Sequence, residues 1–146
     1  MAGFKFRLQS LLNVKRQMED NLKLELAQAN RHLKEETALY DDFIAKKREF
    51  MSFINNETAK GVKVEKLIEY NSYLSQIAMN IEKQKEKVII AQDNADKHRE
   101  RLIKIMQEKK MLEKLKQKKL TQYKAEETRR EQKNYESIVN FALKND

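Results

Sequence analysis

The near absence of glycine and proline constrains this chain more than any other feature of its sequence. Its 146 residues contain no Pro and only two Gly, Gly3 and Gly61. Globular domains use roughly 12% Gly plus Pro, because turns need a backbone with positive φ or with a fixed φ. A fold with many turns, such as a β-sandwich, a barrel or a doubly wound α/β sheet, is therefore strongly disfavoured.

The composition is typical of long, solvated helices, with 37% charged and 40% apolar residues. The chain has no Cys, so it forms no disulfide and holds no thiolate metal site or catalytic thiol. Its longest uncharged run, residues 70–81, spans 12 residues, whereas a membrane span needs about 20 apolar ones. No apolar run follows the basic N-terminal residues, as a secretory signal requires. We expect a cytoplasmic protein with one domain.

Apolar residues recur at alternating steps of three and four, which predicts two heptad seams. Between residues 18 and 29 the first seam contains an eleven-residue unit that locally relaxes the left-handed supercoil. The second seam is regular. The predicted first seam is Phe4, Leu8, Leu11, Lys15, Met18, Leu22, Leu26, Ala29, Leu33, Glu36, Tyr40, Phe43, Lys47, Phe50 and Ile54, and the second is Leu67, Tyr70, Leu74, Ile77, Ile81, Gln84, Val88, Ala91, Ala95, His98, Leu102, Ile105, Lys109 and Leu112.

The segment between the two seams predicts a hairpin turn. It contains Asn55, Asn56 and the only interior glycine, Gly61, which suits the left-handed position just past a helix C-terminus. We therefore expect an all-α, long two-helix antiparallel coiled coil whose second helix extends beyond the first. The expected bounds are about 4–57 and 64–143, with a turn at about 58–63. One unbroken helix of about 140 residues is the alternative, because these residues weaken a helix by only about 1–2 kcal/mol.

Folding back near residue 60 pairs positions whose numbers sum to about 120. Phe4 is then expected opposite Lys116, and about 25 residues of the second helix, from about Thr121, extend past its partner. Ala125 is the only apolar residue between 124 and 134, so this part has nothing to pack against in its own chain. A short apolar stripe follows it, also without an intramolecular partner within reach: Tyr135, Ile138, Val139 and Ala142.

The sequence gives no support for an enzyme. A phosphate-binding loop needs closely spaced glycines followed by Lys and Ser or Thr, which glycines at 3 and 61 cannot supply. The pairing places His32 about 15 Å from His98, so no two-histidine site forms, and His98 fits a tolerated seam position. Acidic pairs such as Glu35 with Glu36 project from a helix surface without a cleft to raise their pKa. We expect no catalytic residue, cofactor or metal.

The positive charge is concentrated in one segment. Residues 97–133 hold 14 Lys and Arg against 6 Glu, and the rest of the chain holds 17 basic against 17 acidic residues. A solvated helix face is the simplest interpretation. An acidic protein partner, a nucleic-acid backbone and anionic lipid are the functional alternatives, although no interleaved aromatic residues or groove-reading motif support nucleic acid.

Aromatic residues gather near the predicted turn. Phe53 and Tyr73 lie beside the seam, so part of this surface should stay exposed and could bind a protein. A bulky tip that only stabilises the turn is the alternative. Six of the eleven aromatic residues of the chain belong to this group: Tyr40, Phe43, Phe50, Phe53, Tyr70 and Tyr73.

The opening residues resemble the N-terminal signature of the bacterial flagellar export protein FliJ. That signature combines a Phe-x-Phe motif, a Leu-x-x-Leu-Leu motif, a basic residue and an acidic pair, found here as Phe4 with Phe6, Leu8 with Leu11 and Leu12, Lys15, and Glu19 with Asp20. Residues 70–74, the basic run at 109–116 and residues 131–133 also resemble that family, as does the length. Residues 135–137, Tyr-Glu-Ser, depart from it.

The resemblance implies a non-enzymatic stalk-like coiled coil of the flagellar type III export apparatus. Its implied partners are the hexameric export ATPase, the cytoplasmic domain of the membrane export gate, and export chaperones. It implies a cytoplasmic protein that associates peripherally with the membrane at the flagellar base through these partners. The expected ATPase-ring contacts are Phe4, Phe6, Arg7, Leu8, Leu11, Lys15, Lys109, Lys116, Arg129 and Arg130, and the expected gate contacts are Phe43, Phe50, Tyr70, Tyr73 and Ile77. A basic coiled coil that binds nucleic acid and a self-associating scaffold are the alternatives.

Overall fold

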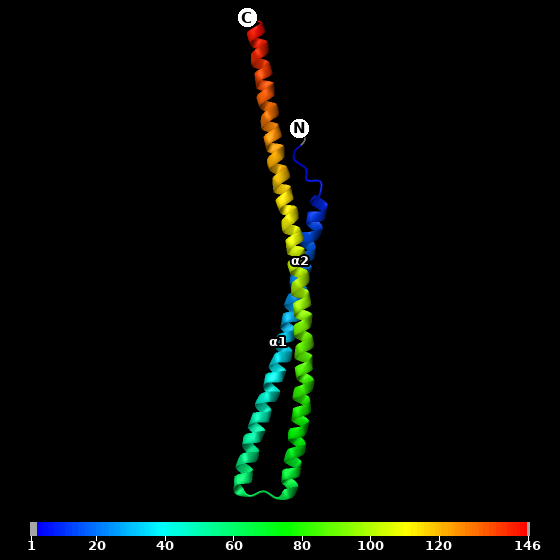
Figure 1. Ribbon diagram of the computed structural model, residues 1–146, viewed down its shortest axis with the longest axis vertical. Coiled ribbons are helices and arrows are strands. Elements are labelled where there is room, and N and C mark those ends of the chain that lie inside the picture. Colours follow the sequence, from blue (N-terminus) through cyan, green and yellow to red (C-terminus); the bar gives the residue numbers. More distant parts are fainter. Residues whose placement is uncertain (1–2, 146) are drawn as a thin grey trace. The chain divides into compact units, whose positions relative to one another are not determined.

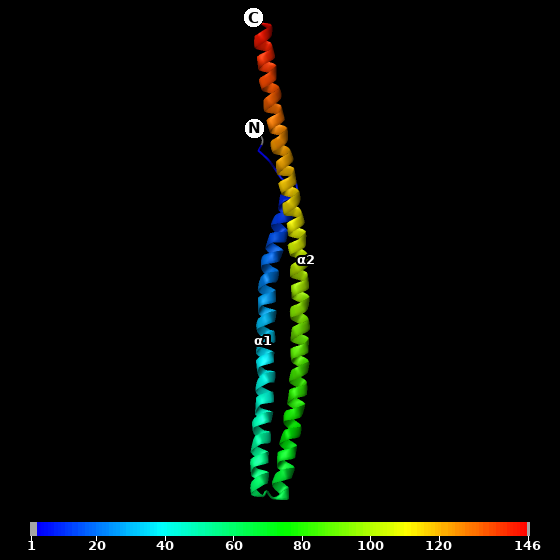
Figure 2. The same cartoon turned by 60° about the vertical axis from the view of Figure 1, so that its left-hand side comes forward.

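The computed structural model describes residues 3–145 and contains two long helices, α1 (Gln9–Lys60) and α2 (Val64–Lys144). Both views of the chain show the two helices side by side and joined by a short turn (Figures 1 and 2). The predicted all-α helical hairpin is confirmed. The described chain forms two compact units: unit 1 comprises residues up to Asn21 together with residues from Ile103, and unit 2 comprises Leu22–Leu102. That the hairpin behaves as a single domain stays a prediction.

Gly61 makes the turn, as its position between the seams predicts. Its φ is 90°, a conformation that residues with a Cβ rarely adopt. The Gly61 N–H donates to the carbonyl oxygen of Thr58 at 3.2 Å, which caps the end of α1. A Cβ built on Gly61 would meet nothing within 4 Å, so the backbone conformation alone selects glycine here.

The predicted start of the first helix at about residue 4 is wrong, because α1 begins at Gln9. No residue from Phe4 to Leu8 can act as an N-cap. Lys5 and Arg7 also oppose the positive end of the helix dipole. These residues leave the helix, and the ring of Phe4 packs against Tyr123 with 5.7 Å between ring centroids.

In unit 2, α1 and α2 pack along a regular seam. Gln84 and the apolar residues Ile77, Ile81, Ala91 and Ala95 of α2 are all buried. Each position of the predicted second seam, from Leu67 in unit 2 to Leu112 in unit 1, is buried or half-buried, so that prediction is confirmed over this range.

In unit 1, the seam of α1 differs from the prediction. Leu12 is fully buried and Glu19 is 5% exposed, whereas the predicted seam residues Leu11 and Met18 are 43% and 39% exposed. The seam therefore keeps unbroken steps of three and four, and the predicted eleven-residue irregularity is wrong. The reason is that Lys109 neutralises the buried carboxylate of Glu19, with 2.6 Å between Nζ and Oε2. A charged residue can therefore occupy the seam position that the helical repeat requires.

The exposed end of α2 starts later than predicted. Glu127 is the last half-buried residue, and the side chains of residues 128–143 are exposed, whereas the prediction placed this boundary near Thr121. Non-helical chain covers up to about 3.3 Å per residue and a helix only 1.5 Å. Residues 4–8 therefore extend farther along α2 than a helical turn would, and Phe4 meets Tyr123 in addition to lying near the predicted Lys116.

Candidate protein-binding surfaces

The N-terminal segment and α2 enclose an open groove of about 680 Å³ in unit 1. Its lining combines apolar and aromatic side chains with three basic ones and one acidic one. Four of the predicted ATPase-contact residues, Phe4, Phe6, Arg7 and Leu8, line it, together with Lys5, Leu115, Lys119, Gln122, Tyr123 and Glu126. We name these ten residues the basic groove. Lys116 lines an adjoining hollow with Phe4, Phe6 and Gln9.

The hydroxyl of Tyr123 donates to Glu127 Oε1 at 2.9 Å. This hydrogen bond to a carboxylate, followed by partial burial, raises the pKa of Tyr123. The phenol is therefore neutral at physiological pH and keeps the proton that it donates to Glu127. Its ring and that of Phe4 hold the two sides of the basic groove together.

Two charge pairs occupy the seam next to the basic groove. Lys15 Nζ donates to Glu108 Oε2 at 2.7 Å, and Lys109 Nζ lies 2.6 Å from Glu19 Oε2. The hydrogen bond from Lys15 lowers the pKa of Glu108, and the hydrogen bond to Glu19 raises the pKa of Lys109. Lys15 and Lys109, both predicted ATPase contacts, are thus engaged in holding α1 to α2.

An apolar stripe on the surface of α1 accompanies these seam charges. Leu11, Val14 and Met18, at spacings of three and four residues, are 43%, 52% and 39% exposed. Leu11 was a predicted ATPase contact, and its exposure leaves it available for one. Val14 was not among the predicted contact residues. The prediction placed Leu11 and Met18 in the seam because they are apolar, and so it did not expect an exposed apolar stripe on this face of α1.

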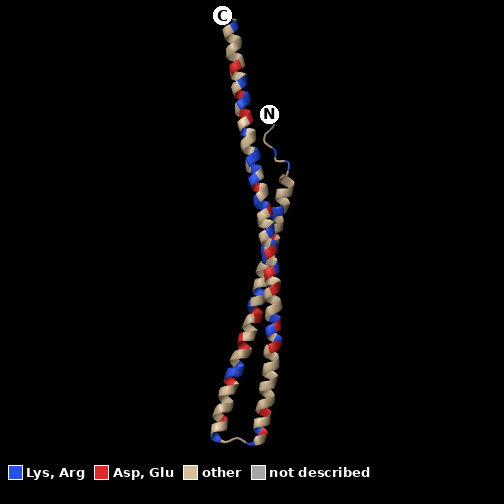
Figure 3. Cartoon of the chain, in the orientation of Figure 1, with Lys and Arg blue, Asp and Glu red and all other residues tan. Residues whose placement is uncertain are grey.

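The basic side chains of α2 are concentrated in unit 1, where Figure 3 shows a dense series of Lys and Arg along the helix. Arg129 and Arg130 are exposed and lie in a shallow hollow with Glu126 and Lys133. This predicted part of the ATPase surface is therefore open to a partner.

Unit 2 carries an aromatic patch, which we define as Phe50, Phe53, Tyr70 and Tyr73. The ring of Phe50 lies at its centre, with centroids 4.4 Å from Tyr73, 5.7 Å from Tyr70 and 5.8 Å from Phe53. Phe53 and Tyr73 are 44% and 49% exposed, which confirms that part of the aromatic surface lies beside the seam. The edge-to-face contacts hold the exposed rings in fixed orientations.

The other predicted gate residues differ from this patch in their surroundings. Phe43 is half-buried, two helical turns before Phe50, and Lys46 Nζ lies 6.0 Å from its ring centroid. Ile77 is only 6% exposed. It therefore offers little surface of its own to a partner.

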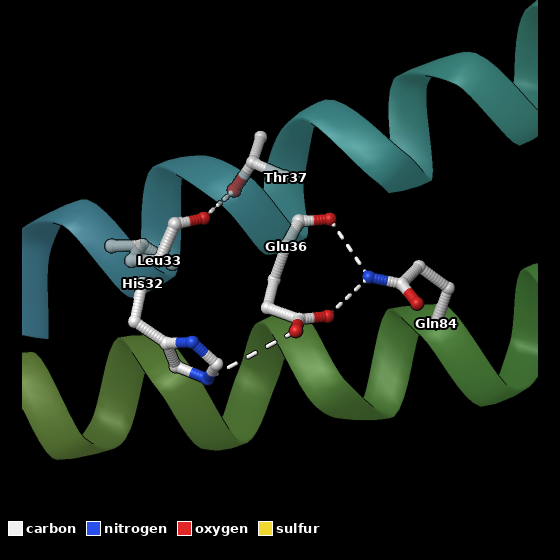
Figure 4. Close-up of polar contacts among 5 residues, drawn as sticks. All are labelled: His32, Leu33, Glu36, Thr37 and Gln84. Atoms are coloured by element: carbon white, nitrogen blue, oxygen red, sulfur yellow. Dashed lines mark hydrogen bonds and ion pairs between the residues drawn. The ribbon is translucent and has the colours of Figure 1, made fainter.

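A polar layer interrupts the seam of unit 2. Gln84 Nε2 donates to the backbone carbonyl of Glu36 at 2.9 Å and to its carboxylate (Figure 4). His32 Nε2 lies 4.0 Å from the other carboxylate oxygen. This layer satisfies a buried amide and specifies which positions of the two helices face each other.

The two histidines stand in separate surroundings. His98 Nδ1 is buried and lies 3.5 Å from Glu25 Oε2, but makes no hydrogen bond, while His32 is exposed beside Glu36. Among residues 3–145, no cluster of three or more His, Cys, Asp or Glu could hold a metal ion. None of the described helices is apolar over a length that could cross a membrane.

The flagellar FliJ protein family matches residues 4–144 of this sequence. The chain belongs to that family. Membership makes it a component of a type III export apparatus, as the resemblance of its opening residues implies. A comparison with curated proteins finds no match.

The fold of this FliJ-family chain also occurs in a solved structure. CT670 from Chlamydia trachomatis, described as a homolog of YscO, superposes with a TM-score of 0.60. The superposition covers 97% of this chain and 96% of CT670, at 17% sequence identity. At this identity the likeness establishes a shared helical-hairpin fold.

The structure thus groups the predicted contact residues of the FliJ-family chain only in part. Phe4, Phe6, Arg7 and Leu8 meet in the basic groove, and Phe50, Tyr70 and Tyr73 meet in the aromatic patch. Leu11 lies on the apolar stripe, and Arg129 with Arg130 lies farther along α2. Leu115, Lys119 and Tyr123 were not among the predicted contact residues, and Tyr123 meets the N-terminal segment because residues 4–8 are not helical.

Proposed function

We propose that this FliJ-family chain is a non-enzymatic, stalk-like coiled coil that binds two proteins of the export apparatus. Unit 1 binds the hexameric export ATPase, and the aromatic patch of unit 2 binds the cytoplasmic domain of the export gate. The chain resides in the cytoplasm and reaches the membrane at the flagellar base through these partners, with export chaperones as additional ones. The observation that carries the proposal is the chemical difference between the exposed surfaces of the two units.

The surface of unit 1 supports binding inside a ring. The lining of the basic groove combines apolar side chains with Lys5, Arg7 and Lys119, and residues 103–133 of unit 1 hold 11 Lys and Arg against five Glu. Such a surface favours a partner with acidic side chains next to apolar ones, because charge complementarity directs association and burial of apolar area stabilises it.

The aromatic patch supports a different kind of contact. Phe53 and Tyr73 together expose apolar ring area with one hydroxyl group, and the uncharged run 70–81 begins within the patch. Tyrosine and phenylalanine anchors of this kind are enriched in protein interfaces. The patch therefore suits a partner that binds through apolar contact rather than through charge.

ATPase stimulation tests the proposal. Adding the purified chain to the export ATPase should raise both hydrolysis and ring assembly. Replacing the exposed pair Arg129 and Arg130 by Gln should weaken stimulation roughly tenfold, because interface residues that carry most of the binding free energy contribute about 1.4 kcal/mol or more.

The matched control replaces Lys85 and Lys87 by Gln. These residues are exposed basic residues of unit 2, so the control removes the same charge elsewhere, and it should stimulate like the wild type. An equal loss of stimulation in both variants would show that stimulation depends only on the net charge of the chain. Unchanged hydrolysis and assembly, together with binding to DNA at physiological salt, would contradict the stalk function and favour a nucleic-acid-binding coiled coil.

A further inference from the structure

The last turns of α2 carry an exposed apolar surface that the proposed function does not use. The side chains of residues 128–143 are all exposed. Tyr135, Ile138, Phe141 and Leu143 are 70%, 69%, 70% and 68% exposed, and Val139 is 36% exposed. Monomeric soluble proteins rarely expose so many large apolar side chains within nine residues, so a binding surface is indicated.

These side chains are sorted onto one face of the helix. At about 100° per residue, Tyr135, Ile138, Val139, Ala142 and Leu143 fall within an arc of about 140°, and Phe141 widens it to about 200°. The remaining arc holds only polar side chains: Glu136, Ser137, Asn140 and Lys144. A two-helix seam needs only a narrow stripe, with two apolar positions in seven, so this face is wider than one partner helix would cover.

The charge around this face is positive. Residues 129–144 hold four Lys and Arg against two Glu, and Arg129, Arg130 and Lys133 are exposed in the turns that precede the face. Lys144 follows it. Basic residues that flank a wide apolar arc with aromatic residues are typical of helices that lie in the interface of an anionic bilayer.

A second copy of the chain fits this face less well. In an antiparallel pair centred on Ile138 and Val139, Lys133 of one copy would lie near Lys144 of the other, and like charges repel. A parallel pair would place every Lys and Arg of the segment beside its equivalent. A bilayer that contains anionic lipid meets both the apolar arc and the positive flanks.

We propose that residues 129–144 of α2 bind directly to the surface of an anionic lipid bilayer. The apolar arc enters the boundary between headgroups and acyl chains, and the flanking Lys and Arg side chains contact the headgroup phosphates. The helix lies along the surface and does not cross the bilayer. The apolar face is separate from the residues proposed to contact the ATPase and the export gate, whereas Arg129 and Arg130 belong to both the ATPase surface and the lipid surface.

Vesicle co-sedimentation with the full chain tests this proposal. Vesicles of phosphatidylcholine with 30% phosphatidylglycerol should bind the chain at least tenfold more tightly than pure phosphatidylcholine vesicles. Ile138→Asp should weaken binding to the anionic vesicles at least tenfold. The matched control is Asn140→Asp, which introduces the same charge on the polar face and should bind within about twofold of the wild type.

A spectroscopic readout locates the contact. The chain has no Trp, so Phe141→Trp introduces a single reporter whose emission should shift to shorter wavelength on anionic vesicles. Helicity measured by circular dichroism checks that the variants remain folded, as expected for substitutions at exposed positions.

Three results would overturn the proposal: equal binding to both kinds of vesicle, equal binding by the Ile138→Asp and Asn140→Asp variants, or an unshifted emission of the reporter. If Ile138→Asp instead impairs ATPase stimulation and leaves vesicle binding unchanged, the face binds protein, and the lipid proposal is wrong while the stalk function stands.

Discussion

At the scale of single residues, unit 1 places charged side chains in the seam and exposes apolar ones within the same three turns of α1. Glu19 is paired with Lys109 in the seam, and Leu11 and Met18 face outward. A buried ion pair adds little net stability compared with apolar packing, but breaking it leaves an uncompensated charge. The pairs therefore specify the register of the helices, and they leave an apolar stripe for contacts outside the chain.

Two neighbouring leucines test this assignment of the seam. Leu12→Ala should lower the free energy of unfolding by about 2–5 kcal/mol, because Leu12 is fully buried and a cavity would remain. Leu11→Ala, at 43% exposure, should lower it by about 0.5 kcal/mol or less. Urea unfolding monitored by circular dichroism measures both. A larger loss of unfolding free energy for the Leu11 variant would show that Leu11, as predicted from the sequence, is the seam residue.

The seam charges also predict how stability depends on pH. The folded-state pKa of Glu108 is lowered by Lys15, so its contribution is complete above its ordinary pKa of about 4.5 and is lost as the pH falls through the folded-state pKa. The pKa of Lys109 is raised by Glu19, so its contribution is complete below about 10.5 and is lost as the pH rises through the folded-state pKa.

Melting temperatures should therefore be level between about pH 5 and pH 10 as far as these two pairs contribute, and should decline at both ends. Lys15→Gln should flatten the acidic decline and leave the alkaline one intact, because it removes only the partner of Glu108. The opposite pattern, or an unchanged acidic limb, would show that the Lys15–Glu108 pair does not contribute to stability.

At the scale of helices, the turn depends on one residue. Gly61→Ala should destabilise the hairpin by about 1–2 kcal/mol, because its φ of 90° places a Cβ against the following carbonyl oxygen. Gly3→Ala is the control, since Gly3 does not have a positive φ and an added Cβ there meets nothing within 4 Å. Thermal unfolding compares the two variants, and equal melting temperatures would contradict the role of Gly61.

Much of the fold could be predicted because helical periodicity is a local signal. The scarcity of Gly and Pro located the turn at Gly61, and the regular spacing from Leu67 to Leu112 gave the buried face of α2. The seam of α1 near Glu19 could not be predicted from polarity, because its burial depends on Lys109, 90 residues away in the sequence. A local sequence pattern does not reveal an ion pair between residues so far apart in the sequence.

The candidate sites were predictable to different degrees for the same reason. The aromatic patch follows from the pairing of two seams across the turn, so Phe50, Tyr70 and Tyr73 could be grouped in advance. The basic groove requires residues 4–8 to leave the helix and reach Tyr123. The apolar residues among residues 4–8 continue the spacing of α1 and so predict a helix there. Only the lack of an N-cap residue indicates that these residues are not helical.

At the scale of the whole molecule, chemically different surfaces suit different proposed partners. The basic groove and the arginines of unit 1 are proposed to bind the ATPase, the aromatic patch of unit 2 the export gate, and the end of α2 the lipid surface. Contacts based on charge and contacts based on apolar area respond differently to salt. Binding to the ATPase should therefore weaken with ionic strength more steeply than binding to the gate.

The most direct test measures ATPase stimulation and gate binding on the same variant, Phe53→Ala with Tyr73→Ala. Its control is Ile89→Ala with Ile90→Ala, a pair of apolar residues in unit 2 that are 58% and 68% exposed. The first variant should lose at least tenfold in affinity for the gate domain while stimulating the ATPase like the wild type, and the control should retain both activities. Parallel loss of stimulation, gate binding and helicity in the first variant would contradict it, because the aromatic patch would then serve only to hold the hairpin together.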